Sequence, residues 1–206
     1  PAAPLRRMDS GAIGSMVADY PLKLDWVSSD RLLATADWLM RESFHKGGFF
    51  QNMIHSGINA YLTLDLAQTL LSYGDSRYMD LVQATADIAS PTGKWPEAVH
   101  PQTEGGCMGD GEHAWAAAEW CQMMRALFIE EGEEELRIGK GLPSAWLEQA
   151  EPMAFGPTLT SWGRVSIEMV KEDNTWRVSV ESDWHRAAPV VKVCLRDDAA
   201  SSLNLN

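Results

Sequence analysis

The residues best suited to chemistry lie close together in the sequence and comprise an indole, a carboxylate and an imidazole, those of Trp95, Glu97 and His100. Pro96 fixes its own φ and pushes Trp95 toward extended backbone, so this loop should hold Glu97 stiffly beside an aromatic face. Such a face suits a sugar ring, and partial exclusion of water raises a carboxyl pKa, as general acid-base catalysis requires. Alternatively, Glu97 caps a backbone turn or pairs with Lys94. We predict a catalytic Glu97 acting on carbohydrate.

A glycine-rich segment with two more polar candidates follows this loop. Residues 104–113 combine four glycines with three acids and His113. Asp110 is suited to N-cap the helix expected next, and His113 would then lie in its first turn, where the helix dipole favours neutral imidazole. The spacing of His100, Asp110 and His113 matches no metal-ligand pattern. We therefore predict no metal and no cofactor.

An internal repeat predicts where these residues meet. Residues 34–37 and 84–87 both read Ala-Thr-Ala-Asp, and each copy leads through a glycine pair to a histidine, His55 or His113. Because the helices that follow should run the same way in a repeat, both histidines should lie at one end with the Glu97 loop. Either histidine alone would more often be structural, so the prediction depends on their convergence. The predicted substrate-binding residues are Trp95, His100, His113, His55 and Asp110.

Four helices are predicted around these loops. Apolar residues recur at helical spacing over 30–44 and 75–89, which leaves each helix a polar side. Residues 52–73 and 111–130 are apolar around most of their circumference, so these helices should be covered on most sides. The order of outer helix, glycine-rich loop and inner helix, repeated, is typical of an α/α toroid or solenoid. Glycine and proline break residues 1–29 too often for a further hairpin.

The period changes after Gly132, where apolar and polar residues begin to alternate as in β-strands. The predicted strands span residues 135–138, 152–155, 164–170, 175–180 and 190–195. The sequence thus predicts an α+β fold. Its parts are an irregular segment (1–29), a partial α/α-toroid of two helical hairpins (30–131), a small antiparallel β-sandwich domain (132–198) and a frayed tail (199–206).

Composition excludes several classes of protein. With 206 residues, 45% hydrophobic and 22% charged, the chain has the balance of a water-soluble globular protein. A net charge of −12 would repel phosphate backbones and anionic membranes, so neither nucleic acid nor a membrane is an expected partner. Three widely spaced cysteines encode no disulfide framework, which favours reduced thiols in the cytoplasm. G-x-S-x-G, P-loop and dinucleotide-binding motifs do not occur.

Together the motifs resemble the closing part of six-hairpin (α/α)6-toroid glycoside hydrolases, a group that includes glucoamylase-like and debranching-type enzymes. The resemblance runs from about Gly11 to Leu195, because a small β-sandwich often follows the toroid in this group. The segments that carry it are residues 11–15, 18–22, 95–101 (Trp-Pro-Glu-Ala-Val-His-Pro), 109–119 (Gly-Asp-Gly-Glu-His-Ala-Trp-Ala-Ala-Ala-Glu), 136–146 and 160–165.

The resemblance implies hydrolysis of glycosidic bonds by two carboxylates, commonly with inversion, with Glu97 as the base that activates water. The group has twelve helices and this chain has four predicted ones, so the partner acid is expected outside this chain. The chain would then be a processed or excised piece, without turnover alone. A second hypothesis is a non-catalytic carbohydrate-binding module, and a third is self-association through exposed helix faces.

Overall fold

A computed structural model of the protein describes residues 9–52, 56–149, 151–173, 175–195 and 200–205. It contains helices and sheets, and the predicted α+β class is confirmed at this level. The chain divides into two compact units, one up to Met123 and one from Met124 on. The boundary lies inside helix α5 (Ala114–Phe128), a few residues before the change of period in the sequence.

Four helices lie where the sequence predicts helices, but the helix predicted over residues 52–73 begins only at Ala60, because residues 57–58 form a strand, and the last of the four continues past Met123 into the second unit. The outer helices α2 (Ser29–Glu42) and α4 (Tyr78–Asp87) bury one face each. The inner helix α3 (Ala60–Ser72) is buried almost all round, as its apolar circumference predicts. By contrast, α5 leaves a long stretch of its surface exposed, although its sequence predicts cover on most sides. The exposed residues of α5 in this unit are Ala114, Trp115, Ala117, Ala118, Cys121 and Gln122.

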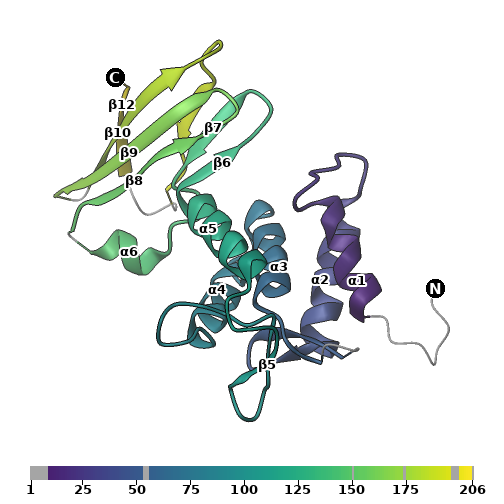
Figure 1. The fold of residues 1–206 in the computed structure, drawn as a ribbon. Coiled ribbons are helices and arrows are strands. Elements are labelled where there is room, and N and C mark those ends of the chain that lie inside the picture. The colour runs from purple at the N-terminus through teal and green to yellow at the C-terminus, as the bar shows by residue number, and fades with distance from the viewer. Residues whose placement is uncertain (1–8, 53–55, 150, 174, 196–199, 206) are drawn as a thin grey trace. The chain divides into compact units, whose positions relative to one another are not determined.

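A five-stranded sheet at one end of these helices gathers the glycine-rich loops of both repeats (Figure 1). The first repeat supplies β1 (Phe44–His45), β2 (Gly48–Gln51) and β3 (Gly57–Ile58), and the second supplies β4 (Ala98–Val99) and β5 (Gly106–Met108). All neighbours in the order β1-β2-β3-β4-β5 are antiparallel, and Ile58 pairs with Val99 where the repeats meet. These strands were not predicted, and they bring the two loops together.

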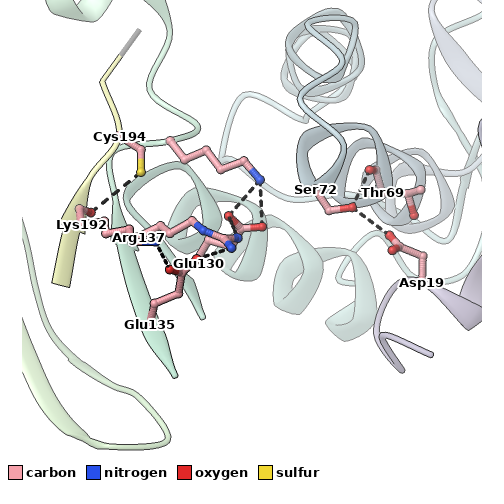
Figure 2. Close-up of polar contacts among 9 residues, drawn as sticks. Asp19, Thr69, Ser72, Glu130, Glu135, Arg137, Lys192 and Cys194 are labelled. Carbon is pink, nitrogen blue, oxygen red and sulfur yellow. Dashed lines mark hydrogen bonds and ion pairs between the residues drawn. The ribbon is translucent and has the colours of Figure 1, made fainter. Parts of the chain in front are cut away.

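The segment before α2 is helical in part and is anchored to α3. It forms α1 (Asp9–Ser15) and a short 3-10 helix, η1 (Met16–Ala18), where the sequence predicts an irregular segment. The Ser72 hydroxyl lies 3.1 Å from Asp19 Oδ2 and 2.9 Å from the Thr69 carbonyl oxygen (Figure 2). Burial, followed by the charge and the hydrogen bond of Asp19, raises the pKa of the Tyr73 phenol to about 12.

The second unit holds two sheets and a short helix, α6 (Ser144–Glu148). The strands are β6 (Ile129–Glu131), β7 (Glu135–Ile138), β8 (Met153–Leu159), β9 (Gly163–Glu172), β10 (Thr175–Trp184), β11 (Val190–Val193) and β12 (Ala200–Leu205). A four-stranded sheet has the order β12-β10-β9-β8, and a three-stranded sheet has the order β11-β7-β6. Alternating residues of β9 and β10 are buried, as the period of two predicts.

Two features of this unit differ from the predicted antiparallel arrangement. Strand β12 pairs in parallel with β10, where the sequence predicts a frayed tail, and β11 pairs in parallel with β7. Ion pairs cross the three-stranded sheet, because Arg137 contacts Glu130 at 3.0 Å and also pairs with Glu135 (Figure 2). The Arg137 guanidinium is thus paired with two carboxylates, and its contact with Glu130 links β7 to β6.

Candidate functional site

The Glu97 loop is held by the small sheet and by close glycine contacts. Glu97 precedes β4, and its backbone N–H donates to the Met108 carbonyl of β5 at 3.1 Å. A Cβ placed on Gly109 would lie 3.4 Å from both Cβ and N of Glu97, and one on Gly106 would lie 3.0 Å from Pro96. The glycine-rich segment therefore lies directly on the loop. Glycine is needed at 109 for a second reason, since its φ is +75°.

His113 fixes the start of α5 against the same loop. Its backbone N–H donates to the Trp95 carbonyl at 2.8 Å, and its ring Nδ1 accepts the Ala116 backbone N–H at 3.3 Å. His113 is thus the residue that caps α5. The expectation that Asp110 caps this helix is wrong, because the Asp110 carboxylate accepts the Glu112 N–H at 3.0 Å inside the preceding turn.

Tyr61, in the first turn of α3, is the common neighbour of the loop and of α5. Its ring centroid lies 4.9 Å from that of His113 and 4.5 Å from that of Trp115, on which it stacks. Burial, then the negative charges of Glu97 and Asp65, raise the pKa of Tyr61. The Tyr61 phenol is therefore expected to be neutral, in surroundings that are partly shielded from water and negatively charged. Trp115 is 51% exposed, so its indole is open to a ligand.

Trp95 is buried and presents no free face, which differs from the predicted sugar platform. It is 5% exposed, its Nε1–H donates to the Thr85 carbonyl at 2.9 Å, and its ring lies 5.2 Å from that of Trp120. It shares a core cluster with Ala60, Tyr61 and Ala116. Trp95 therefore supports the site from the buried core, and Trp115 is the indole available for stacking.

The remaining predicted residues have other surroundings. His100 serves its own turn, because its Nδ1 accepts the backbone N–H groups of Gln102 and Thr103 at 3.3 and 3.2 Å. Lys94, the alternative partner of Glu97, pairs with Glu112 instead. His55 lies outside the described residues, so its predicted convergence with His113 stays a prediction.

A carboxyl pair lies one helical turn further along α3 and α5. Asp65 follows Tyr61 by four positions and Glu119 follows Trp115 by four, and the two carboxyl groups hydrogen-bond each other. The Tyr20 hydroxyl donates to Glu119 Oε2 at 2.6 Å, and the Trp115 Nε1–H lies 3.3 Å from Oε1. Burial, followed by the charge and the hydrogen bond of Glu119, raises the pKa of Asp65 to about 8.

The raised pKa of Asp65 favours its protonated form at neutral pH, because burial and the adjacent Glu119 both disfavour a second negative charge here. Burial and the contact with Glu119 also raise the pKa of Tyr20, so that phenol stays neutral as a donor. The network ties the N-terminal segment to both inner helices. The matching steps from Tyr61 to Asp65 and from Trp115 to Glu119 show that the two helices run the same way at this contact.

Four residues of this site are not predicted from the sequence, because each lies within an apolar helix: Tyr61, Asp65, Trp115 and Glu119. A usable signal was present, because each inner helix carries an aromatic residue near its start and an acid four residues later. Residues spaced by four share a helix face. Two such pairs on neighbouring helices predict a polar contact between them.

Within the described residues, no group of three or more His, Cys, Asp or Glu side chains is placed to hold a metal ion. No helix in that part of the chain has both the length and the apolar character needed to cross a bilayer.

No known protein-family model matches the sequence, and no curated protein matches it significantly. Inference about function therefore depends on the residues around Tyr61.

Proposed function

We propose that this chain is part of a glycoside hydrolase that acts on oligo- or polysaccharides. In this proposal Glu97 is the general base of an inverting two-carboxylate reaction, and the partner acid lies outside these 206 residues. The helices would belong to an α/α toroid, and the sheets of the second unit would form a β-sandwich. The location would be cytoplasmic, with no cofactor.

The observation that carries the proposal is the packing of the His113 ring and the exposed Trp115 indole on Tyr61, whose pKa is raised by burial and then by the charge of the nearby Glu97. An aromatic face next to carboxylates is the combination that binds sugar rings, since C–H groups lie on the ring while hydroxyl groups donate to oxygen. The Trp115 face and the His113 ring supply the first part of this combination. Glu97 supplies the second.

The Asp65–Glu119 pair does not supply both catalytic carboxylates. Its two groups hydrogen-bond each other, whereas the carboxyl groups of inverting glycosidases stand about 6.5–9.5 Å apart to admit water. Both oxygens of Glu119 also accept hydrogen bonds from neighbouring side chains. We assign this pair to positioning Trp115 and Tyr61, and Glu97 to chemistry.

Titration of the purified chain with maltotetraose and with cellotetraose by calorimetry tests the binding half of the proposal. One of the two should bind, and Trp115→Ala should weaken that binding at least about tenfold because a stacking face is lost. Trp26→Ala is the matched control, since Trp26 is 77% exposed and belongs to another part of the unit. Equal binding by the Trp115 variant and the unchanged chain would contradict a carbohydrate-binding site at Trp115.

Glu97→Gln tests the chemical half. The variant should bind sugar as tightly as the unchanged chain, and the chain alone should release no reducing sugar. In the longer protein that supplies the acid, Glu97→Gln should lower kcat by about 10²–10⁴-fold with little change in binding. Reducing sugar released by the chain alone contradicts the external acid, and an unchanged kcat contradicts the role of Glu97.

One observation favours a second function, self-association. The exposed side of α5 is largely apolar, with Ala117, Ala118 and Cys121 at helical spacing beside Trp115. A surface of this kind would be covered in a dimer as well as in a complete toroid. Light scattering that shows a monomer at high protein concentration would count against this second function, and a concentration-dependent dimer would support it.

A further inference from the structure

The Tyr20 side chain joins the segment before α2 to the middle of α5. Its hydroxyl donates to Glu119 Oε2 at 2.6 Å in a partly buried position, across 99 positions of the sequence. Burial, followed by the hydrogen bond and the charge of Glu119, raises the pKa of this phenol, so Tyr20 stays a donor at neutral pH. Tyr20 lies in residues 18–22, one of the segments that carry the glycosidase resemblance, and the proposed reaction gives this segment no role.

Glu119 connects Tyr20 to an exposed indole. Its second oxygen, Oε1, accepts the Trp115 Nε1–H at 3.3 Å, and Asp65 of α3 also hydrogen-bonds this carboxyl group. A glutamate side chain on a half-exposed helix surface has several rotamers of similar energy. Contacts from other elements select one of them, and here Tyr20 and Asp65 make such contacts. Tyr20 thus helps to decide where the acceptor for the Trp115 indole lies.

Stacking on Tyr61 does not by itself fix the orientation of Trp115. The two ring centroids lie 4.5 Å apart with an angle of 30° between the rings, and half of the Trp115 surface is exposed. Stacked aromatic rings tolerate sliding and rotation in the ring plane, because the attraction is spread over the whole face. The hydrogen bond from Nε1 to Glu119 fixes which edge of the indole lies toward the protein. The face offered to a ligand therefore depends on Glu119.

The backbone around Tyr20 is itself held in place, as a positioning residue requires. The Tyr20 backbone N–H donates to the Met16 carbonyl at 3.1 Å. The preceding residue, Asp19, accepts the Ser72 hydroxyl at 3.1 Å and also hydrogen-bonds Tyr73, so the segment is attached to the C-terminal end of α3 (Figure 2). The Tyr20 hydroxyl therefore reaches Glu119 from an anchored backbone.

We propose that Tyr20 is a positioning residue for the ligand-stacking indole of Trp115, and that it acts through the Glu119 carboxylate. Its hydroxyl holds Glu119 in one rotamer, and Glu119 holds the indole edge. The inference rests on the proposed carbohydrate site, because it assigns a role to the indole that would stack on the sugar. The orientation of that indole is measurable without any ligand, so the two proposals can fail separately.

The test follows the indole N–H signals of the tryptophan-labelled chain by ¹⁵N–¹H NMR in Tyr20→Phe. The chain has nine tryptophans, and Trp115→Phe and Trp95→Phe identify the two signals needed. In Tyr20→Phe the Trp115 signal should move toward the position of a solvent-exposed indole, because its acceptor is no longer held. The Trp95 signal is the internal reference for an intact core, since this N–H donates to the Thr85 carbonyl, and it should not move. An unmoved Trp115 signal overturns the proposal.

Tyr73→Phe is the matched control. It removes a phenol hydroxyl that anchors the same segment through Asp19, whereas the Tyr20 hydroxyl bonds Glu119. The Trp115 signal should stay in place in Tyr73→Phe. Equal movement in both variants would show that general anchoring of the segment matters and would overturn a specific role of Tyr20.

Glu119→Ala tests the middle of this connection. It should move the Trp115 signal by itself, and adding Tyr20→Phe to it should cause no further movement, because the group through which Tyr20 acts is already absent. An unmoved Trp115 signal in Glu119→Ala overturns the proposal even where Tyr20→Phe does not fold. A Tyr20→Phe effect of the same size with and without Glu119 also overturns it.

Sugar binding completes the test. Whichever of maltotetraose and cellotetraose binds the unchanged chain should bind Tyr20→Phe about fivefold more weakly, the factor expected for about one hydrogen bond, and Tyr73→Phe equally well. Equal binding by Tyr20→Phe despite a moved Trp115 signal would overturn the positioning role. If neither sugar binds, the carbohydrate proposal fails, while the indole signals still decide whether Tyr20 orients Trp115.

Discussion

Replacing Asp65 by asparagine should make the stability of the protein less dependent on pH. In the folded protein Asp65 holds a proton because it is buried against Glu119, which raises its pKa from 3.8 to about 8. The asparagine amide also donates a hydrogen bond to Glu119 and has the same size, but it cannot ionise. The variant thus keeps the contact and removes the titration.

The sign and size of the effect follow from the two pKa values. Since the folded-state pKa lies above the unfolded-state value, stability is fully present below about pH 4 and is lost as the pH rises toward about 8. At about 1.4 kcal/mol per pKa unit, the full difference corresponds to on the order of 5 kcal/mol. We expect about 2–3 kcal/mol, because Asp65 keeps some contact with solvent and can turn toward water once ionised.

Urea unfolding of the wild-type protein and the variant between pH 4 and pH 8 measures this difference. The two proteins should have similar unfolding free energies near pH 4, and Asp65→Asn should be the more stable by about 2–3 kcal/mol at pH 8. Taking the difference between the two proteins cancels the titration of groups that do not interact with Asp65. Asp80→Asn, at an exposed position, should follow the wild type at every pH. A constant difference between wild type and Asp65→Asn across this range would refute the raised pKa of Asp65.

Two further predictions concern the support of the site and the second unit. Trp95→Ala should lower the unfolding free energy in urea by about 3–5 kcal/mol, because it empties a core position and leaves the Thr85 carbonyl unpaired, whereas Trp26→Ala should change it by less than about 0.5 kcal/mol. Equal effects of the two would show that Trp95 is not part of a packed core. Gly163→Ala should lower the midpoint of thermal unfolding, since φ is +155° there and a Cβ would collide with the Asp183 carbonyl and lie 2.8 Å from Trp184 Cα. Gly11→Ala is its control, because nothing lies within 4 Å of that Cβ, and an equal loss in both variants would contradict the steric argument.

The parts of the fold that follow from local periodicity were predictable from sequence. Helices α2, α4 and α5 and strands β7, β9 and β10 fall close to their predicted ranges, because their apolar residues repeat with a fixed period, whereas the helix predicted from residue 52 begins only at Ala60. Strands β1 to β5 were missed because they have two to four residues each, too few to show a period. Pairing such as Ile58 with Val99 joins residues far apart in the sequence and is set by tertiary structure.

The candidate site was predictable only in part, for a related reason. The repeat indicates that the Glu97 loop and His113 belong together, and the hydrogen bond from His113 to Trp95 joins them in the structure. The sequence does not show which indole is covered, and here Trp95 is buried while Trp115 is open. Similarly, an apolar helix such as α5 predicts a surface that needs cover, but the cover itself is not encoded in that helix.

Helix α5 has a consequence for how this protein can be divided, because the boundary between Met123 and Met124 falls within its Ala114–Phe128 span. A break inside a helix leaves carbonyl groups on one side and amide groups on the other without their helical hydrogen-bond partners. Recombination at that point would fuse part of this helix to an unrelated protein segment on each side of the break. Since the boundary between the units falls within one helix, a gene segment that moves either unit with this helix intact must carry part of the other unit.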